Sequence, residues 1–300
     1  MLDALTYFLS QVVNGVKLGS VYAMVAIGYS MVYGILRLIN FAHGDIMTVG
    51  VYTILVLTTA FGMPLWVTVI ISVIIAVFVG LSAERFAYRP LRSAGEETTL
   101  VSSLAVSIFL QNLLVMIFSP QRKAFHLSEQ LTELHSFGTI RLSTMNIITF
   151  ITVIIVLLIL SHMIKNTRIG MAMRACSDNM NAAKLMGINI TSVIVTAFII
   201  GSALAALSGL MLAGEYKTID PLMGFVPGLK AFCAAVLGGI GSLSGAVLGG
   251  FVLGIAEMLF AGLMPTEFTA YRDAFVFALL ILVLLIRPNG ILGTKDGGRS

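Results

Sequence analysis

The chain has 300 residues, of which 58% are hydrophobic and only 11% are charged. Soluble domains carry about a quarter charged residues, so this composition predicts a polytopic membrane protein and gives no support to a nucleic-acid binder. The net charge of +4 fits the tendency of Lys and Arg to collect in the cytoplasmic loops of membrane proteins.

The apolar runs predict the membrane spans in chain order. Residues 2–17 show helical periodicity with one apolar face, which suits a helix in the membrane interface or against the bundle. Runs long enough to cross a bilayer follow at about 18–36, 46–62, 64–83, 98–118, 146–164, 192–213 and 273–286. We therefore expect a single, all-α transmembrane domain over residues 1–300.

One apolar stretch, 226–262, is too long for one ordinary span, and glycines interrupt it between Gly238 and Gly245. We expect two short spans or half-helices around a turn, which gives about 8–9 transmembrane helices with broken or re-entrant segments. Irregular backbone at membrane depth is tolerated only where protein or water covers it. This segment should therefore lie inside the bundle.

The basic residues predict the orientation. Lys and Arg gather at 85–92, at 165–184 and in the tail from Arg287. An even number of predicted spans separates each group from the next. The positive-inside rule then places all three groups and the C-terminus in the cytoplasm and the polar loop 119–144 in the periplasm. The side of the N-terminus stays open.

A polar island lies between two spans and is expected to form a cytoplasmic loop and helix within 165–190. Ser177 or Asp178 is a predicted N-cap and Gly187 a predicted C′ residue, which bracket a short helix over 178–186. Ala182, Ala183, Leu185 and Met186 would give that helix a small, apolar face. An ordinary loop helix is the alternative, but the length, basic charge and caps of the island favour docking of a partner.

Two further places hold ionisable residues in apolar surroundings. Asn40, His43 and Asp45 lie between two predicted spans, where they either have a functional role or form a surface turn in which Asn40 or Asp45 caps the next helix. Glu257 lies within an apolar run. It either pairs with Lys230 or a helix dipole, or it lines a polar cavity.

The sequence contains no recognisable catalytic or cofactor motif. It has no G-x-x-x-x-G-K-[ST] segment, no metal-ligand spacing and no Ser/His/Asp or Cys/His constellation. Cys176 and Cys233 lie in different contexts, so we expect no disulfide framework. We expect no enzyme activity and no cofactor in this chain, so any ATP must be bound by another chain.

Several motifs resemble those of a known family. The segment from Asn181 to Gly187 resembles the EAA-x-x-x-G coupling motif of bacterial ABC importer permeases, with Asn181 in place of Glu. The resemblance to LivH-type branched-chain amino acid permeases runs in order from about residue 8 to residue 293. It is carried by the segments 39–50, 84–92, 107–112, 230–242 and 288–293.

The resemblance implies an ABC importer permease fold in the bacterial inner membrane. It also implies a heterodimer with a LivM-type second permease, two ABC ATPase subunits, a periplasmic amino-acid-binding protein, and leucine, isoleucine or valine as substrate. The residues expected to couple to an ATPase are Arg174, Asp178, Asn181, Ala182, Ala183 and Gly187. The residues hypothesised to form the pathway or gate are Asn40, His43, Asp45, Gly239, Gly241 and Glu257.

Other transport classes stay open as alternatives. Related permeases carry urea, amides or other amino acids. A proton-coupled secondary transporter would use Asp45 or Glu257 as a titrating group, and a channel would show passive flux. The capped island argues against the last two, since neither class needs a docking element.

Overall fold

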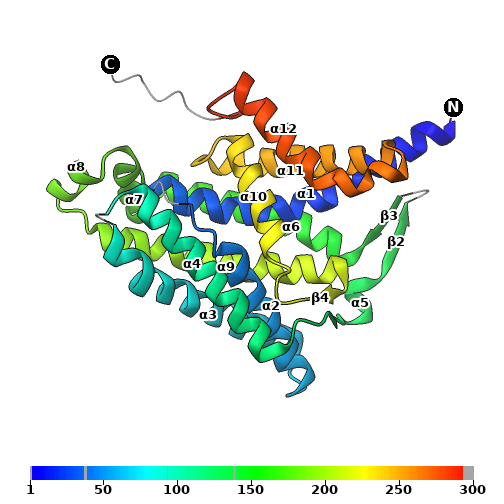
Figure 1. Ribbon diagram of the computed structural model, residues 1–300, viewed down its shortest axis with the longest axis horizontal. Coiled ribbons are helices and arrows are strands. Elements are labelled where there is room, and N and C mark those ends of the chain that lie inside the picture. The colour runs from blue at the N-terminus through cyan, green and yellow to red at the C-terminus, as the bar shows by residue number, and fades with distance from the viewer. Residues whose placement is uncertain (1, 37–38, 93, 138–139, 293–300) are drawn as a thin grey trace.

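The computed structural model describes residues 2–36, 39–92, 94–137 and 140–292 (Figure 1). Nine helices form its body: α1 (Leu2–Leu36), α2 (His43–Thr59), α3 (Leu65–Ala83), α4 (Glu96–Phe118), α6 (Thr144–Asn166), α9 (Ile190–Tyr216), α10 (Phe225–Gly238), α11 (Leu243–Leu263) and α12 (Arg272–Ile286). Seven helices of the described chain are long and apolar enough to cross a membrane, and α10 is a shorter apolar helix. The prediction of an all-α polytopic membrane protein is confirmed.

Short elements connect these helices. A π-helix (Glu84–Tyr88) and a 3-10 turn (Arg89–Leu91) continue α3, and another 3-10 helix (Thr266–Tyr271) precedes α12. The polar segments contain α5 (Glu129–Thr132), α7 (Arg168–Asp178), α8 (Met180–Leu185), β1 (Lys123–Ala124), β2 (Leu134–Phe137), β3 (Ile140–Ser143) and β4 (Thr218–Ile219). Strand β1 pairs antiparallel with β4, and β2 pairs antiparallel with β3.

Helix α1 is the central element of the bundle. We predicted a separate helix over 2–17 before the first span, but the structure has one continuous helix of 35 residues. The polar residues of its first half find partners along the helix and on α11: Lys17 Nζ donates to Asn14 Oδ1 at 3.2 Å, and Tyr7 Oη donates to the Gly262 carbonyl at 2.8 Å. Because these groups are satisfied, nothing forces the helix to end at the membrane surface.

An outer layer of helices surrounds this centre. The most apolar window of α1 is 89% buried within the chain, whereas those of α3, α4, α6 and α12 are 22%, 22%, 17% and 6% buried. Since the exposed side chains of these four helices are mainly Ile, Leu, Val and Phe, their outer faces suit lipid or a neighbouring subunit. The inner layer consists of α1, α2, α9, α10 and α11.

Small residues set the closest approach between α1 and α11. Gly15, Gly19 and Ala23 of α1 lie against Gly250 and Gly254 of α11. A Cβ on Gly15 would lie 2.5 Å from the Ile255 Cα atom, and one on Gly250 would lie 2.5 Å from the Ala23 nitrogen. Small residues four positions apart let helix backbones pack closely where lipid provides no hydrophobic drive for association.

Two helices begin inside the bundle. Helix α2 has 17 residues and α10 has 14, so at 1.5 Å per residue they measure about 26 and 21 Å, shorter than a hydrocarbon core of about 30 Å. Their first turns meet at glycines: a Cβ on Gly228 would lie 3.2 Å from the Gly44 Cα atom. The expected division of 226–262 is confirmed, because α10 ends at Gly238 and α11 begins at Leu243, although α11 has 21 residues and is a full-length span.

The two ends of the bundle differ. The island end holds α7, α8 and the turn between α10 and α11, where the tail docks through a 2.9 Å hydrogen bond from Ile291 N to the Leu237 carbonyl. The π-helix lies there too, since the rings of Tyr88 and Phe198, near the start of α9, are 5.7 Å apart. The described parts of the three basic groups thus share one end, as predicted. Strands β1–β4 lie at the opposite end (Figure 1).

Candidate functional site

The island forms two helices rather than the single predicted one. Helix α7 begins after Thr167, whose Oγ1 accepts a 3.1 Å hydrogen bond from Gly170 N, and it ends at Asp178. Helix α8 begins after Asn179, whose Oδ1 accepts a 3.0 Å bond from Ala182 N. The prediction of Ser177 or Asp178 as N-cap was therefore wrong. Asn179 is the better cap because it adopts the extended backbone that an N-cap needs, while Asp178 is still helical.

The predicted end of the island helix at Gly187 is confirmed. Gly187 has a φ of 82°, which an L side chain adopts only with strain. Its nitrogen donates to the Lys184 carbonyl at 3.1 Å, and Ile188 N donates to the Ala183 carbonyl at 3.1 Å. These two bonds form a Schellman motif, which satisfies the last carbonyls of α8.

The exposed face of α8 differs from the one predicted. Ala183 is buried at 3% exposure and packs inward, whereas Leu185 and Met186 are 88% and 83% exposed. Asn181 and Ala182 are also exposed. The period of 3.6 residues separates Ala183 from Leu185 and Met186 once the helix is anchored, and the sequence alone does not show which side is anchored. The exposed surface of α8 therefore includes Asn181, Ala182, Leu185 and Met186.

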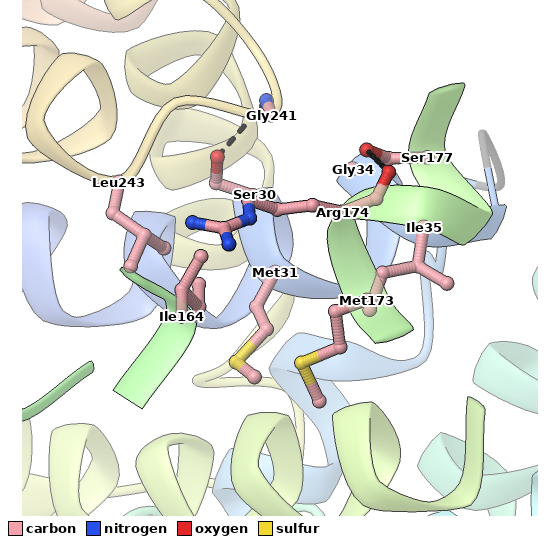
Figure 2. Close-up of a pocket in the computed structure, with 10 residues that line it drawn as sticks. All are labelled: Ser30, Met31, Gly34, Ile35, Ile164, Met173, Arg174, Ser177, Gly241 and Leu243. Atoms are coloured by element: carbon pink, nitrogen blue, oxygen red, sulfur yellow. Dashed lines mark hydrogen bonds between the residues drawn. The ribbon is translucent and has the colours of Figure 1, made fainter. Parts of the chain in front are cut away.

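Arg174 connects the island to the bundle. Its side chain extends from α7 toward the turn at Gly241 and, with Ser30, Gly34 and Ile164, lines a cavity of about 80 Å³ (Figure 2). Gly241 has a φ of 90°, and its nitrogen donates to Ser30 Oγ at 3.0 Å. The structure thus brings together two predicted sets, the coupling residue Arg174 and the glycine turn that includes Gly239 and Gly241.

A buried ion pair stabilises the same end. The Arg92 guanidinium bonds to the carboxylate of Glu84, which is almost fully buried. Desolvation lowers the pKa of Arg92, and the Glu84 carboxylate opposes that shift. The pair fixes the polar segment after α3 against the bundle.

The polar residues before and within α2 are core residues. Asn40 Oδ1 accepts from Tyr88 Oη at 2.8 Å, and Asp45 Oδ2 accepts from Ser107 Oγ at 2.5 Å. The His43 ring lies 4.6 Å from that of Tyr29. All three are nearly inaccessible, and none lines a described cavity. The capping alternative is wrong, because Ala42 is the N-cap of α2 and no side chain bonds there.

Glu257 lies apart from these groups, toward the opposite end. Its Oε1 accepts from Lys230 Nζ at 2.7 Å and from Arg272 Nε at 2.8 Å, and its Oε2 accepts from Tyr22 Oη at 2.9 Å. Lys230 also lies 2.6 Å from Asp273 Oδ1. The predicted partnership with Lys230 is confirmed. Sequence reasoning missed Tyr22, Arg272 and Asp273, although the Arg-Asp pair opening an apolar run was a visible signal.

Comparison with known proteins identifies the family. A model of the family described as "Branched-chain amino acid transport system / permease component" matches residues 11–284. The chain belongs to this family. It is 43% identical to the LivH permease protein of Salmonella typhimurium, over 99% of each chain, and 42% identical to BraD of Pseudomonas aeruginosa, over 97% of each.

The fold has a more distant relative among solved structures. PsaBC from Streptococcus pneumoniae matches with a TM-score of 0.52 at 13% identity, covering 92% of this chain and 91% of that one. At this identity the similarity concerns the fold alone. It shows that this permease shares its helical arrangement with a protein of very different sequence.

Proposed function

We propose that this permease is a transmembrane subunit of an ATP-driven importer that carries leucine, isoleucine and valine across the bacterial inner membrane. LivH and BraD are each named as a "high-affinity branched-chain amino acid transport system permease protein", which supports the substrate class. The complex would contain a LivM-type second permease, two ABC ATPases and a periplasmic amino-acid-binding protein. The lipid bilayer covers the outer helices.

The observation that carries this proposal is the α7–α8 island. It is capped at Thr167, Asn179 and Gly187, so its shape is fixed without support from lipid. It exposes Leu185 and Met186, which is costly in water unless a partner covers them. A rigid, polar helix pair with an apolar tip suits a groove in an ATPase subunit.

The contacts of α7 indicate how motion enters the bundle. Helix α8 follows the ATPase when nucleotide binding closes it, and α7 moves with α8 because only Asn179 separates them. Helix α7 contacts α1, α6 and α9, and Arg174 extends to the turn at Gly241. A shift of the island would therefore displace the central helix and the Gly239–Gly241 turn together.

The distribution of charge supports an assignment of the two ends of the bundle to the two sides of the membrane. The described parts of all three basic groups lie at the island end, so this end and the C-terminus face the cytoplasm by the positive-inside rule. The segment 119–144 and the start of α1 then face the periplasm. The chain itself is not an enzyme in this proposal, and ATP is bound and hydrolysed by the ATPase subunits.

Uptake by the reconstituted complex tests the proposal. Proteoliposomes with the binding protein outside the membrane and the ATPase subunits inside should accumulate leucine only with ATP, and uptake should persist when a protonophore collapses the proton gradient. Uptake driven by an imposed proton gradient without ATPases would instead support a secondary transporter that uses Asp45 or Glu257. Transport of urea or amides in preference to leucine would overturn the substrate class.

A further inference from the structure

A cavity of about 340 Å³ lies at the end opposite the island, between α1, α9, α10 and the start of α12. One wall is apolar and consists of Leu212, Met223, Val226 and Pro227. The rest of the lining consists of Tyr22, Tyr216, Thr218 and charged side chains of both signs, namely Lys230, Arg272, Asp273, Arg122 and Asp220. Nothing in the coupling mechanism uses this cavity.

The charges around the cavity balance. Lys230 and Arg272 contact Glu257, and Lys230 also contacts Asp273. Arg122 Nε lies 3.7 Å from Asp220 Oδ2. Each cation therefore has a carboxylate counterpart. The lining itself holds three cations and two carboxylates, and the buried Glu257 carboxylate, which contacts Lys230 and Arg272, brings the net charge to zero. A site with no net charge attracts neither a simple anion nor a simple cation, but it offers both poles to a ligand that carries one charge of each sign.

The members of the network differ in how freely they can change partners. The side chains of Lys230 and Glu257 are 3% and 0% exposed, so separating them would cost each charge a buried partner. Those of Arg272 and Asp273 are 32% and 53% exposed, and exposed ion pairs cost little to exchange. Arg272 and Asp273 are thus the groups that a ligand can engage, while Lys230 and Glu257 hold them in place.

The volume of the cavity and its apolar wall restrict the class of ligand further. The cavity lies at the lower end of the roughly 300–1,000 Å³ of small-molecule sites. An aliphatic amino acid has an ammonium, a carboxylate and an apolar side chain within one small molecule. Each of these three parts has a counterpart in the lining.

We propose that this cavity binds an aliphatic amino acid in its zwitterionic form as it passes from the external binding protein into the permease. Asp273 and Asp220 receive the α-ammonium group, Arg272 and Arg122 receive the α-carboxylate, and the apolar wall around Val226 receives the side chain. The proposal rests on the proposed function, because it takes the opposite end to be periplasmic and the cargo to be an amino acid.

The test is protection of a cysteine in the cavity. A Val226→Cys variant, in the complete complex with Cys176 and Cys233 replaced by Ala, is labelled with a membrane-impermeant thiol reagent in right-side-out vesicles without ATP. Leucine at about ten times its dissociation constant should slow the labelling about tenfold. 4-Methylpentanoate and 3-methylbutylamine, which each keep one charge and the same alkyl chain, should give no protection at equal concentration.

Two controls separate binding from indirect effects. Ser128→Cys is exposed at the same end but does not line the cavity, so leucine should leave its labelling rate unchanged. Adding Arg272→Gln and Asp273→Asn to Val226→Cys should abolish protection while the unprotected labelling rate stays the same. Equal protection by the singly charged analogues, no protection by leucine, or no labelling of Val226→Cys would each overturn the proposal.

The outcome is distinguishable from failure of the proposed function. ATP-driven leucine uptake by the unmodified complex tests the importer and its substrate, whereas protection of Val226→Cys tests the cavity alone. Normal uptake without protection would reject the amino acid site in the cavity, while the proposed importer function would be retained. Protection without ATP-driven uptake would reject the importer and leave an amino acid site.

Discussion

Gly187, at the end of the island, is constrained by backbone geometry rather than by packing. At Gly187 the positive φ is required by the Schellman motif, yet no atom lies within 4 Å of the position that a Cβ would occupy. A substitution there meets strain and no clash. The effect of a side chain should therefore follow its tolerance for the left-handed region, in which Asn is favoured and β-branched residues are not.

We predict that Gly187→Val uncouples ATP hydrolysis from transport, whereas Gly187→Asn retains coupling. The Val side chain costs about 1–2 kcal/mol in the left-handed region and would unwind the end of α8, whose exposed face is the proposed docking surface. The measurement is leucine uptake per ATP hydrolysed in proteoliposomes, with membrane insertion checked by yield. Equal coupling in both variants and the parent would reject docking through α8.

Buried charge behaves differently from exposed charge in the Glu257 network. We predict that Glu257→Leu lowers the free energy of unfolding by about 3 kcal/mol, since Lys230 would lose a buried partner. Asp273→Asn should cost less than about 1 kcal/mol, because the Asp273 side chain is about half exposed. Thermal unfolding of the detergent-purified chain measures both. A larger loss from Asp273→Asn would show that the burial pattern does not control stability here.

Among the elements, the pairing of α1 with α11 depends on small residues. Glycines at positions 15, 19, 250 and 254 allow a close approach of backbones along the central helix. The same principle acts at the meeting of α2 and α10, where Gly44 faces Gly224 and Gly228. Both contacts place the half-helices and the central helix so that the inner layer has no room for added side chains.

We predict that Gly254→Val destabilises the bundle by about 1–3 kcal/mol, the usual cost of overpacking. A Cβ at Gly254 would collide with the backbone of α1 at Gly19. Val252→Leu adds volume to the same helix where the side chain is exposed, so it should leave stability unchanged. The retained monodisperse fraction after heating in detergent distinguishes the two. Equal stability of both variants would show that α1 and α11 separate without cost.

At the scale of the whole molecule, the island and the cavity lie at opposite ends of the bundle, and the proposed mechanism gives each end a different task. The described parts of the three basic groups lie at one end, and the cavity of about 340 Å³ with its ion pairs lies at the other. In the proposed mechanism, the motion of the ATPase subunits would reach the permease through the island on the cytoplasmic side. The substrate would enter through the cavity on the periplasmic side. Helix α1 connects the two, because it contacts both α7 and α10 and contributes Ser30 to one cavity and Tyr22 to the other.

Cysteine labelling from one side of the membrane tests this arrangement. In a background lacking Cys176 and Cys233, we predict that an impermeant thiol reagent labels Ser128→Cys in right-side-out vesicles but not Lys184→Cys. Inverted vesicles should give the reverse pattern, since both positions are exposed and lie at opposite ends. Labelling of both positions from the same side would contradict the assigned topology.

Much of this protein follows from the sequence itself. An apolar run long enough to cross a bilayer can satisfy its backbone hydrogen bonds only as a helix, so the spans were predictable. The break at Gly239–Gly241 was predictable because the stretch around it is too long for one span. The Gly187 terminus was predictable because few residues besides glycine adopt a positive φ readily. The family motifs also lie in the sequence, which is why the resemblance and the matched family agree.

Tertiary structure decided what depends on which side of a helix is covered. Ala183 and Leu185 are both apolar, and only packing shows that the first is anchored and the second is free. Asn40, His43 and Asp45 were hypothesised from the sequence to form the pathway or gate, and only the structure shows that Tyr88, Tyr29 and Ser107 contact them in the core. The ion pairs of Arg272 with Glu257 and of Asp273 with Lys230 appear only in the folded structure. Local sequence determines backbone conformation, whereas exposure and long-range charge pairing are properties of the assembled bundle.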